Sequence, residues 1–337
     1  MIDEKLLIIN DLKTAFSTSM GSVTVVDDVS LYIKKKETLA LVGESGCGKS
    51  MTSLSIMQLL PVNGKIMNGE IIFNNHNLVE LSDKEMSKVR GNDIAMIFQE
   101  PMTSLNPVLT IGDQITEGLL LHRKLSKKEA KDRAVALLKL VGFSRAVEVM
   151  KEYPHQLSGG MRQRVMIAMA MSVDPSLLIA DEPTTALDVT IQAQILELMQ
   201  ELKEKFDTSI LLITHDLGVV AEMADRVVVM YAGEVVEEAD ALSLFEDPSH
   251  PYTQGLIKSV PSLDVQQERL YSIPGTVPAP NEVTVGCRFA PRCAQAWERC
   301  SKEKPSLYQR KNGHQVRCFL YELGEGTNYN ESGATHS

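Results

Sequence analysis

A glycine-rich segment, "GESGCGKS" at residues 43–50, combines the residue types that bind phosphate. It follows an apolar stretch at 38–43 that predicts a buried strand, and it precedes a predicted helix at 50–60, as a phosphate-binding loop does. These flanks disfavour the alternative, a glycine-rich turn without a ligand. In such a loop backbone N–H groups surround the phosphate, Lys49 reaches the outer phosphates and the Ser50 hydroxyl ligates Mg²⁺. We therefore predict a nucleotide site formed by Gly43, Glu44, Ser45, Gly46, Cys47, Gly48, Lys49, Ser50 and Met51.

Two acidic residues and a histidine follow apolar stretches that also predict buried strands. Asp181 and Glu182 come directly after "LLIA", and His215 comes directly after "SILLIT". Because the carboxyl ends of parallel strands meet at one edge of a sheet, we expect these side chains beside the phosphates. Asp181 would hold Mg²⁺ through water, Glu182 would polarise the attacking water, and His215 would approach the γ-phosphate. Taken singly, acids at a strand end are as often only solvated, and a lone histidine is more often structural.

A second candidate anion site is "LSGGMRQR" at residues 157–164. A predicted helix opens there on Ser158, Gly159 and Gly160. Free N–H groups at a helix start attract anions, although a plain N-cap with a flexible entry would have the same sequence. One nucleotide cannot readily use two such sites in different subdomains of one chain. We therefore expect a head-to-tail dimer that clamps each nucleotide between the phosphate loop of one chain and this segment of the other.

The elements that must position these residues predict an α/β fold. Apolar strands that alternate with helices indicate a parallel sheet covered on both faces. Residues 6–11 and 23–33 instead alternate apolar and polar positions, as half-buried antiparallel strands do. Residues 111–142 predict a helical region, in which Ser126 and Glu129 form a capping box.

Length and composition restrict the class of protein. The 337 residues suffice for two domains; we place the boundary near residue 245 and expect a disordered tail at 324–337. A formal net charge of −10 disfavours sequence-independent binding to nucleic acid. Because the sequence has neither a run of about 18 apolar residues nor a basic signal peptide, we expect a cytosolic protein. Disulfides are rare in that compartment.

The order and spacing of five segments resemble the ATP-binding subunit of an ABC transporter: "GESGCGKS", "LSGGMRQR", "LLIADEP", "TALD" and "THD". The resemblance implies an ABC-type P-loop ATPase domain at 1–245, with a RecA-like core, an antiparallel β subdomain and a helical subdomain at about 102–165. It implies that Gln99 in "IFQEP" ligates Mg²⁺ and links the attacking water to a membrane subunit. The nearest aromatic candidate to stack on adenine is Phe16. The resemblance also assigns a signature and a dimer interface to Gly160, Gln163 and Asp188.

Segments outside this shared core are similar to the oligopeptide/dipeptide importer branch of the family. "IFQEPMTSLNPVLTIGDQI" and "HPYTQGLIKSVPSLD" carry the similarity, and "GKSMTSLSIMQLLP" resembles the D-type subunit. The resemblance implies an F-type ATPase subunit as heterodimer partner, two membrane permease subunits and an extracytoplasmic peptide-binding protein, with this chain at the cytoplasmic face of the membrane. Import of nickel or another small solute is the alternative. A soluble ABC ATPase is disfavoured, since the chain has neither long coiled-coil insertions nor a second cassette.

Four of the five cysteines lie within residues 287–318, each next to an arginine. They are Cys287, Cys293, Cys300 and Cys318. Their clustering indicates a common ligand, and their spacing lacks the short knuckle of most structural zinc sites. We therefore favour a [4Fe–4S] cluster over Zn²⁺, with unliganded thiols third.

The arginines beside these cysteines support that preference. We expect guanidiniums close to the sulfurs to lower the thiol pKa values and to stabilise the anionic shell of a cluster. Some members of the peptide-importer branch hold such a cluster through four cysteines near the C-terminus, and these positions resemble theirs. The site would then stabilise a small C-terminal domain at 246–323 and take no part in redox chemistry.

Overall fold

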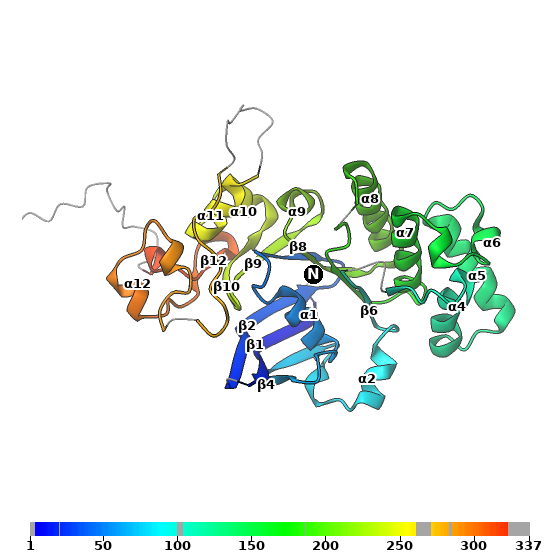
Figure 1. The fold of residues 1–337 in the computed structure, drawn as a ribbon, viewed down its shortest axis with the longest axis horizontal. Helices are drawn as coiled ribbons and strands as arrows, with labels where there is room; N and C mark the ends of the chain where they lie inside the picture. The colour runs from blue at the N-terminus through cyan, green and yellow to red at the C-terminus, as the bar shows by residue number, and fades with distance from the viewer. Residues whose placement is uncertain are drawn as a thin grey trace, which may run out of the picture.

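The computed structural model describes residues 4–19, 21–99, 104–185, 187–260, 271–282 and 285–322. Within that part of the chain, strands form a larger sheet of eight and a smaller one of four (Figure 1). The strands of the larger sheet are β3 (Thr38–Val42), β6 (Ile94–Ile97), β7 (Leu177–Asp181), β8 (Ser209–Thr214), β9 (Arg226–Tyr231), β10 (Glu234–Asp240), β11 (Tyr308–Gln309) and β12 (Gln315–Val316). They lie in the order β11-β12-β10-β9-β3-β8-β7-β6.

The centre of the larger sheet is parallel and fully buried. β3 pairs with β8 and β9, and β7 pairs with β6 and β8, all in parallel. Every residue of β3, β7, β8 and β9 is buried, as in a sheet covered on both faces. The predicted α/β class is therefore confirmed, and the carboxyl ends of β3, β7 and β8 lie along one edge.

The smaller sheet is antiparallel and comes from the N-terminal part of the chain. Its strands are β1 (Lys5–Thr18), β2 (Gly21–Lys34), β4 (Gly64–Phe73) and β5 (His76–Asn77), in the order β2-β1-β4-β5. The antiparallel strands expected at 6–11 and 23–33 are confirmed, but both extend further because β1 pairs with β2 and β4 along most of its length. Leu7 and Ile9 of β1 share a core with Leu39 and Leu41 of β3, which joins the two sheets.

Helices cover the larger sheet and extend one end of the molecule. They are α1 (Lys49–Ile56), α2 (Asp83–Val89), α4 (Ile111–His122), α5 (Lys127–Leu140), α6 (Ala146–Val149), α7 (Gly159–Ala170), α8 (Val189–Phe206) and α9 (Leu217–Met223). The helical region expected at 111–142 is two helices, α4 and α5. The predicted capping box is present at the start of α5: Ser126 Oγ accepts from Glu129 N at 3.3 Å, and the Glu129 carboxylate accepts from Ser126 N at 2.8 Å. In the described residues, no helix is long and apolar enough to cross a membrane.

Short elements form the C-terminal region: α10 (Ala241–Glu246), α11 (Pro251–Lys258), α12 (Glu298–Lys302) and 3₁₀ turns at Ala290–Arg292, Lys311–Gly313 and Phe319–Tyr321. This region lies at the opposite end of the molecule from α4, α5 and α6 (Figure 1). β12 pairs with β10, so the region extends the larger sheet. Tyr252 and Phe289 enter the same core as Val42 and Tyr231. The boundary expected near residue 245 falls in α10, and the tail at 324–337 lies outside the described residues.

Candidate active site

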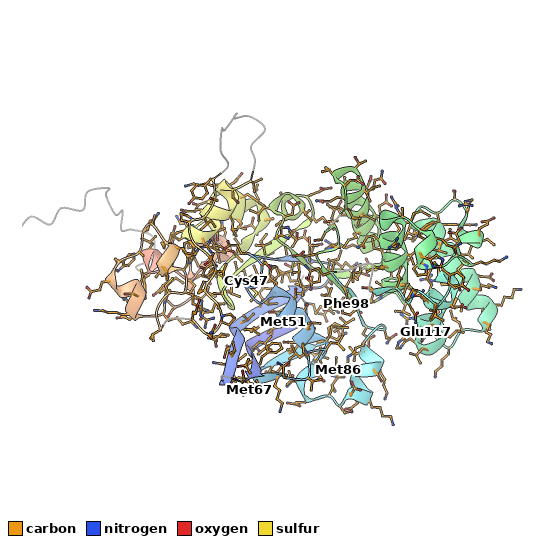
Figure 2. The ribbon with its side chains drawn as sticks, viewed as in Figure 1. Cys47, Met51, Met67, Met86, Phe98 and Glu117 are labelled. Atoms are coloured by element: carbon orange, nitrogen blue, oxygen red, sulfur yellow. The ribbon has the colours of Figure 1, made fainter. Side chains whose placement is uncertain are left out.

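The phosphate-loop segment connects the buried strand β3 to α1. Its backbone requires glycine: Gly43 has φ +149°, and a Cβ there would lie 2.2 Å from Met230 O. Gly48 has φ +104°, and a Cβ there would lie 2.7 Å from Val25 O. Cys47 and Met51, labelled in Figure 2, lie where this loop enters α1, close to the junction of the two sheets. The loop is therefore pressed against β9 and β2, a close approach that side chains would prevent.

The two polar side chains at the end of the loop face its interior. The Lys49 ammonium donates to Gly43 O at 2.7 Å and to Glu44 O at 3.1 Å, and its side chain is buried. Ser50 Oγ donates to Asp181 Oδ1 at 3.2 Å, which joins the start of α1 to the end of β7. The structure therefore brings the predicted lysine, hydroxyl and first carboxylate into one site.

Glu182 receives hydrogen bonds from three sides. Gln99 Nε2 and Thr185 Oγ1 each donate to Glu182 Oε2 at 2.9 Å. His215 Nδ1 lies 3.2 Å from Oε1. The Glu182 backbone has φ +47°, an uncommon conformation for a side-chain-bearing residue, and its N–H donates to Ile213 O at 2.8 Å on β8. The end of β7 thus turns sharply, and Gln99 and His215 meet at its second acid.

The two neighbouring acids have pKa values shifted in opposite directions. Burial raises the pKa of Asp181; the hydrogen bond from Ser50 opposes this shift and the charge of Glu182 adds to it. Burial also acts to raise the pKa of Glu182, but hydrogen bonds from Thr185 and His215 outweigh it and hold that pKa below its usual value. Glu182 is therefore a carboxylate at neutral pH, the form that can accept a proton from water.

An open cavity of about 430 Å³ adjoins these groups. Ser45, Gln99, Glu182 and His215 line it from the cassette side. Leu256, in α11 of the C-terminal region, lines it from the other. The site can therefore hold a phosphate chain between a cationic loop and an ionised carboxylate, with room for water beside them.

Comparison with known proteins places this site in a family. A family model for ABC transporters matches residues 26–185, and one for the C-terminal region of oligopeptide/dipeptide transporters matches residues 236–300. The chain is 60% identical to the oligopeptide transport ATP-binding protein AppD of Bacillus subtilis (strain 168), over 94% of this chain and 97% of that protein. It belongs to the ABC transporter family. A second relative, the dipeptide transport ATP-binding protein DppD of the same organism, is 53% identical over 95% of this chain and 96% of its own length.

Solved ABC structures have the same fold. A dimeric ATP-binding cassette in a post-hydrolysis state with ADP and Pi is 29% identical, with a TM-score of 0.63. The match covers 70% of this chain and 98% of that one. The protein cbiO1 from Clostridium perfringens, part of an ABC transporter complex, is 27% identical, also with a TM-score of 0.63, over 72% of this chain and 92% of its own. The predicted ABC-type ATPase fold is confirmed.

The segment predicted to be the ABC signature opens α7 at the protein surface. Ser158 caps this helix, with its Oγ accepting from Met161 N at 3.3 Å, and Gly159 is exposed beside it. Gly160 packs on α8, since a Cβ there would lie 2.8 Å from Ile191 Cγ2. Asp188 is exposed at the start of α8 and accepts from Ile191 N at 3.0 Å. Figure 1 shows α7 and α8 to one side of α1.

Two residues predicted to belong to the nucleotide site, Gln163 and Phe16, pack against other parts of this chain. Gln163 is fully buried, and its Nε2 donates to Pro183 O at 2.5 Å, beside the acids that end β7. Its side chain therefore links α7 to the active-site turn and does not face a second chain. Phe16 is half-buried on β1, and its ring covers Gly64 of β4, where a Cβ would lie 2.8 Å from Cε1.

The four clustered cysteines of this ABC protein gather around one small cavity. Cys287, Cys293, Cys300 and Cys318 line it together with His250 and other side chains. Burial, together with the neighbouring cysteines, raises the pKa of Cys287 to about 11 and that of Cys318 to about 12. Among the described residues, no group of three or more His, Cys, Asp or Glu side chains is arranged to hold a metal ion. As they are placed among the described residues, these thiols therefore do not form a [4Fe–4S] or zinc site.

The expected effect of the adjacent arginines on these thiols is wrong. Arg288 pairs with Asp27 and Glu234, and Arg292 pairs with Glu44. Arg299 pairs with Glu303 and Glu322, and Arg317 donates to the Val235 carbonyl. Each guanidinium thus points to an oxygen acceptor, because successive side chains of an irregular segment point in different directions. Burial is instead the largest influence on the pKa values of Cys287, Cys293 and Cys318.

Proposed function

We propose that this chain is the subunit that hydrolyses ATP to power the import of oligopeptides or dipeptides across the cytoplasmic membrane. The observation that supports hydrolysis best is the Glu182 carboxylate, kept ionised beside the phosphate loop by Gln99, Thr185 and His215. The peptide cargo rests on AppD and DppD, whose names describe oligopeptide and dipeptide transport. The chain would act as a peripheral subunit at the cytoplasmic face.

The nucleotide would bind with its phosphates on the loop at residues 43–50. Lys49 and the loop N–H groups would neutralise the charge of the phosphates. Met51, in the first turn of α1, would lie next to this phosphate site. Ser50 and Asp181, already joined at 3.2 Å, would hold Mg²⁺, which neutralises charge on the phosphates when bound. Phe16 is only half-buried, and the part of its ring that does not pack on Gly64 would stack on the adenine.

Hydrolysis would use the second acid at the end of β7. Glu182 would accept the proton of the attacking water, while His215 and Gln99 hold its carboxylate in place. Gln99 would also ligate Mg²⁺ and pass the state of the site to the permease. The attacking water would occupy the adjoining cavity, which both Glu182 and the loop residues Gly43 and Ser45 line.

The active form would be a head-to-tail dimer with an F-type ATPase subunit. Ser158 and Gly159 are exposed at the start of α7, and Asp188 is exposed nearby, as an interface to a second chain requires. The solved cassette that resembles this chain is a dimer. ATP drives closure only if it binds the closed dimer more tightly than the open one, and hydrolysis then removes that preference.

Two permease subunits and an extracytoplasmic peptide-binding protein would complete the importer. A groove of about 940 Å³ between α4, α5 and α6 is lined by Asp113, Glu117, Leu120 and Lys131, among others. It lies on the helical end of the molecule, where Figure 2 labels Glu117. We propose that a permease segment docks there, so that movement of the helices on ATP binding reaches the membrane.

The test is purification of the tagged full-length chain from membranes in mild detergent, followed by uptake assays in vesicles. We expect two integral membrane proteins and a second ATPase subunit to co-purify, and uptake of labelled peptides to require ATP. Recovery of a purely soluble complex would contradict a role in transport. Uptake of Ni²⁺ or another solute, without uptake of peptides, would show that the proposed cargo is wrong while the proposed ATPase role stands.

We further propose that the four-cysteine cavity holds a thiolate-bound metal group, a [4Fe–4S] cluster in preference to Zn²⁺. Its support is the common cavity and the buried His250, whose Nδ1 accepts from Tyr252 N at 3.1 Å while its Nε2 has no hydrogen-bond partner. Binding would require the thiols to deprotonate and turn inward. Iron and sulfide in anaerobically purified protein would support the cluster. One zinc per chain without sulfide would show that the site binds Zn²⁺ instead.

A further inference from the structure

One arginine of the C-terminal region reaches the phosphate loop. Arg292 Nη1 lies 2.7 Å from Glu44 Oε2, and Arg292 Nη2 lies 3.1 Å from Glu44 Oε1, a two-pronged ion pair. The Arg292 side chain is only 4% exposed. Its Nε donates to Pro274 O at 2.9 Å and its Nη1 lies 3.3 Å from Tyr231 Oη, so the guanidinium is held on every side.

A tyrosine of the same region holds the backbone of the same loop residue. Glu44 N donates to Tyr252 Oη at 2.8 Å. The Tyr252 ring is fully buried and packs against the rings of Tyr231 and Phe289, with centroids 4.6 and 5.4 Å away. Both the main chain and the side chain of Glu44 are thus fixed by residues that follow the ABC cassette.

We propose that Arg292 and Tyr252 are positioning residues for the phosphate loop, through which the C-terminal region sets the affinity of the chain for ATP. The inference rests on the proposed ATPase function and adds a part of the chain outside the cassette to its nucleotide site. Neither residue touches the reacting atoms; both act through Glu44.

Two physical effects support this role. The loop binds phosphate through N–H groups that must already point inward, so fixing Glu44 reduces the entropy lost when ATP binds. Glu44 also brings a negative charge next to a site for a strongly anionic ligand. Its charge is offset by Arg292, and an uncompensated carboxylate there would repel the phosphates.

The ion pair between Arg292 and Glu44 predicts a specific effect of Arg292→Met. This change keeps much of the buried side-chain volume but removes the guanidinium. We expect an affinity for Mg²⁺-ATP about tenfold lower, with KM raised more than kcat is reduced. The double variant Arg292→Met/Glu44→Gln should recover most of the affinity, because it removes the unpaired charge together with its partner. Titration calorimetry and steady-state kinetics on the full-length chain measure both effects.

Arg299→Met is the matched control, because Arg299 lies in the same region and pairs with Glu303 and Glu322, away from the loop. It should leave ATP affinity unchanged. Tyr252→Phe gives an independent test if Arg292→Met does not fold, since it keeps the buried ring and removes only the acceptor for Glu44 N. We expect Tyr252→Phe to raise KM severalfold.

The results separate this inference from the proposed function. If the wild-type chain neither binds nor hydrolyses ATP, the proposed function fails. If it does both, and either Arg292→Met or Tyr252→Phe binds ATP as tightly as the wild type, the positioning role is wrong. Equal weakening in Arg292→Met and Arg299→Met, or a double variant no better than Arg292→Met, would also overturn it, because the effect would then not pass through Glu44.

Discussion

The nucleotide site and the cysteine cavity both gather residues from distant parts of the chain, but by different means. At the nucleotide site, the parallel strands β7 and β8 end side by side, and their ends bring Glu182 and His215 together. At the cysteine cavity, the thiols come from turns, short helices and a terminal segment. A regular strand fixes the direction of the residue that follows it, whereas an irregular segment leaves that direction to local contacts.

The electrostatics of the two sites differ in the same way. Hydrogen-bond donors surround Glu182 and keep it ionised despite its partial burial. The thiols of Cys287 and Cys318 are partly buried in the same cavity and have raised pKa values. The nucleotide site is therefore organised around a charge, and the cysteine cavity around neutral groups. The arginines of the C-terminal region instead hold this region to the cassette, as Arg292 does at Glu44.

The largest expected effect tests the charge at the nucleotide site. Glu182→Gln keeps the shape of the side chain but removes the group that accepts the proton. We expect ATP affinity to stay within a few-fold and kcat to fall by about a thousandfold, within the range of general-base catalysis. Nucleotide binding and phosphate release by the purified chain measure the two quantities. Turnover near the wild-type rate would show that another group is the base.

The next effect tests how the C-terminal region is held to the larger sheet. Glu237 on β10 is buried; it accepts from Ser249 N at 2.6 Å and from His250 N at 2.8 Å, and lies 2.7 Å from His314 Nε2. We expect Glu237→Gln to destabilise the chain by about 3 kcal/mol, because it disrupts a buried charged network. Thermal unfolding at neutral pH measures the loss, and a change below 1 kcal/mol would mean that this network contributes little.

The same carboxylate predicts the acid dependence of stability. Burial acts to raise the pKa of Glu237, but hydrogen bonds from His314 and from the Ser249 and His250 N–H groups outweigh it, so its folded pKa lies below the usual 4.5. The stability it contributes is therefore fully present above pH 4.5 and is lost as the pH falls through the folded pKa. Glu237→Gln should lower stability at neutral pH and make it less sensitive to pH below 4.5; an unchanged acid dependence would contradict this assignment.

A smaller effect tests a donor that the motifs did not reveal. Thr185 Oγ1 donates to Glu182 Oε2 at 2.9 Å. Thr185→Val removes this hydrogen bond, so we expect the pKa of Glu182 to rise and kcat to fall by about tenfold. The acidic limb of the pH profile of kcat should move to higher pH, which a change in packing alone would not produce. Thr185→Ser, which keeps the hydroxyl, should stay near the wild type.

The sequence predicts the candidate site correctly where the residues follow regular strands, because the position of a residue in a strand determines the direction of its side chain. The spacing around Asp181, Glu182 and His215 predicts their meeting, because they follow parallel strands. The expectation that the arginines lie against the cysteine sulfurs is wrong, since adjacency in an irregular segment does not determine contact. Arg292 and Tyr252 were missed because 248 and 208 residues separate them from Glu44.

The smallest expected effect concerns helix α5, which lies at the helical end of the molecule (Figure 1). There the local sequence alone should determine the stability of the helix start. Ser126 accepts from Glu129 N in the capping box of α5, on the surface of the helical end. Ser126→Ala removes the acceptor and should destabilise the chain by about 1 kcal/mol. Ser126→Asp supplies an acceptor again and should restore most of that stability. Thermal unfolding measures both, and ATP affinity and kcat should not change, because the hydrogen bonds of this cap join Ser126 and Glu129 to each other. A loss of ATP affinity in Ser126→Ala would mean that the helical end is coupled to the phosphate loop even in a single chain.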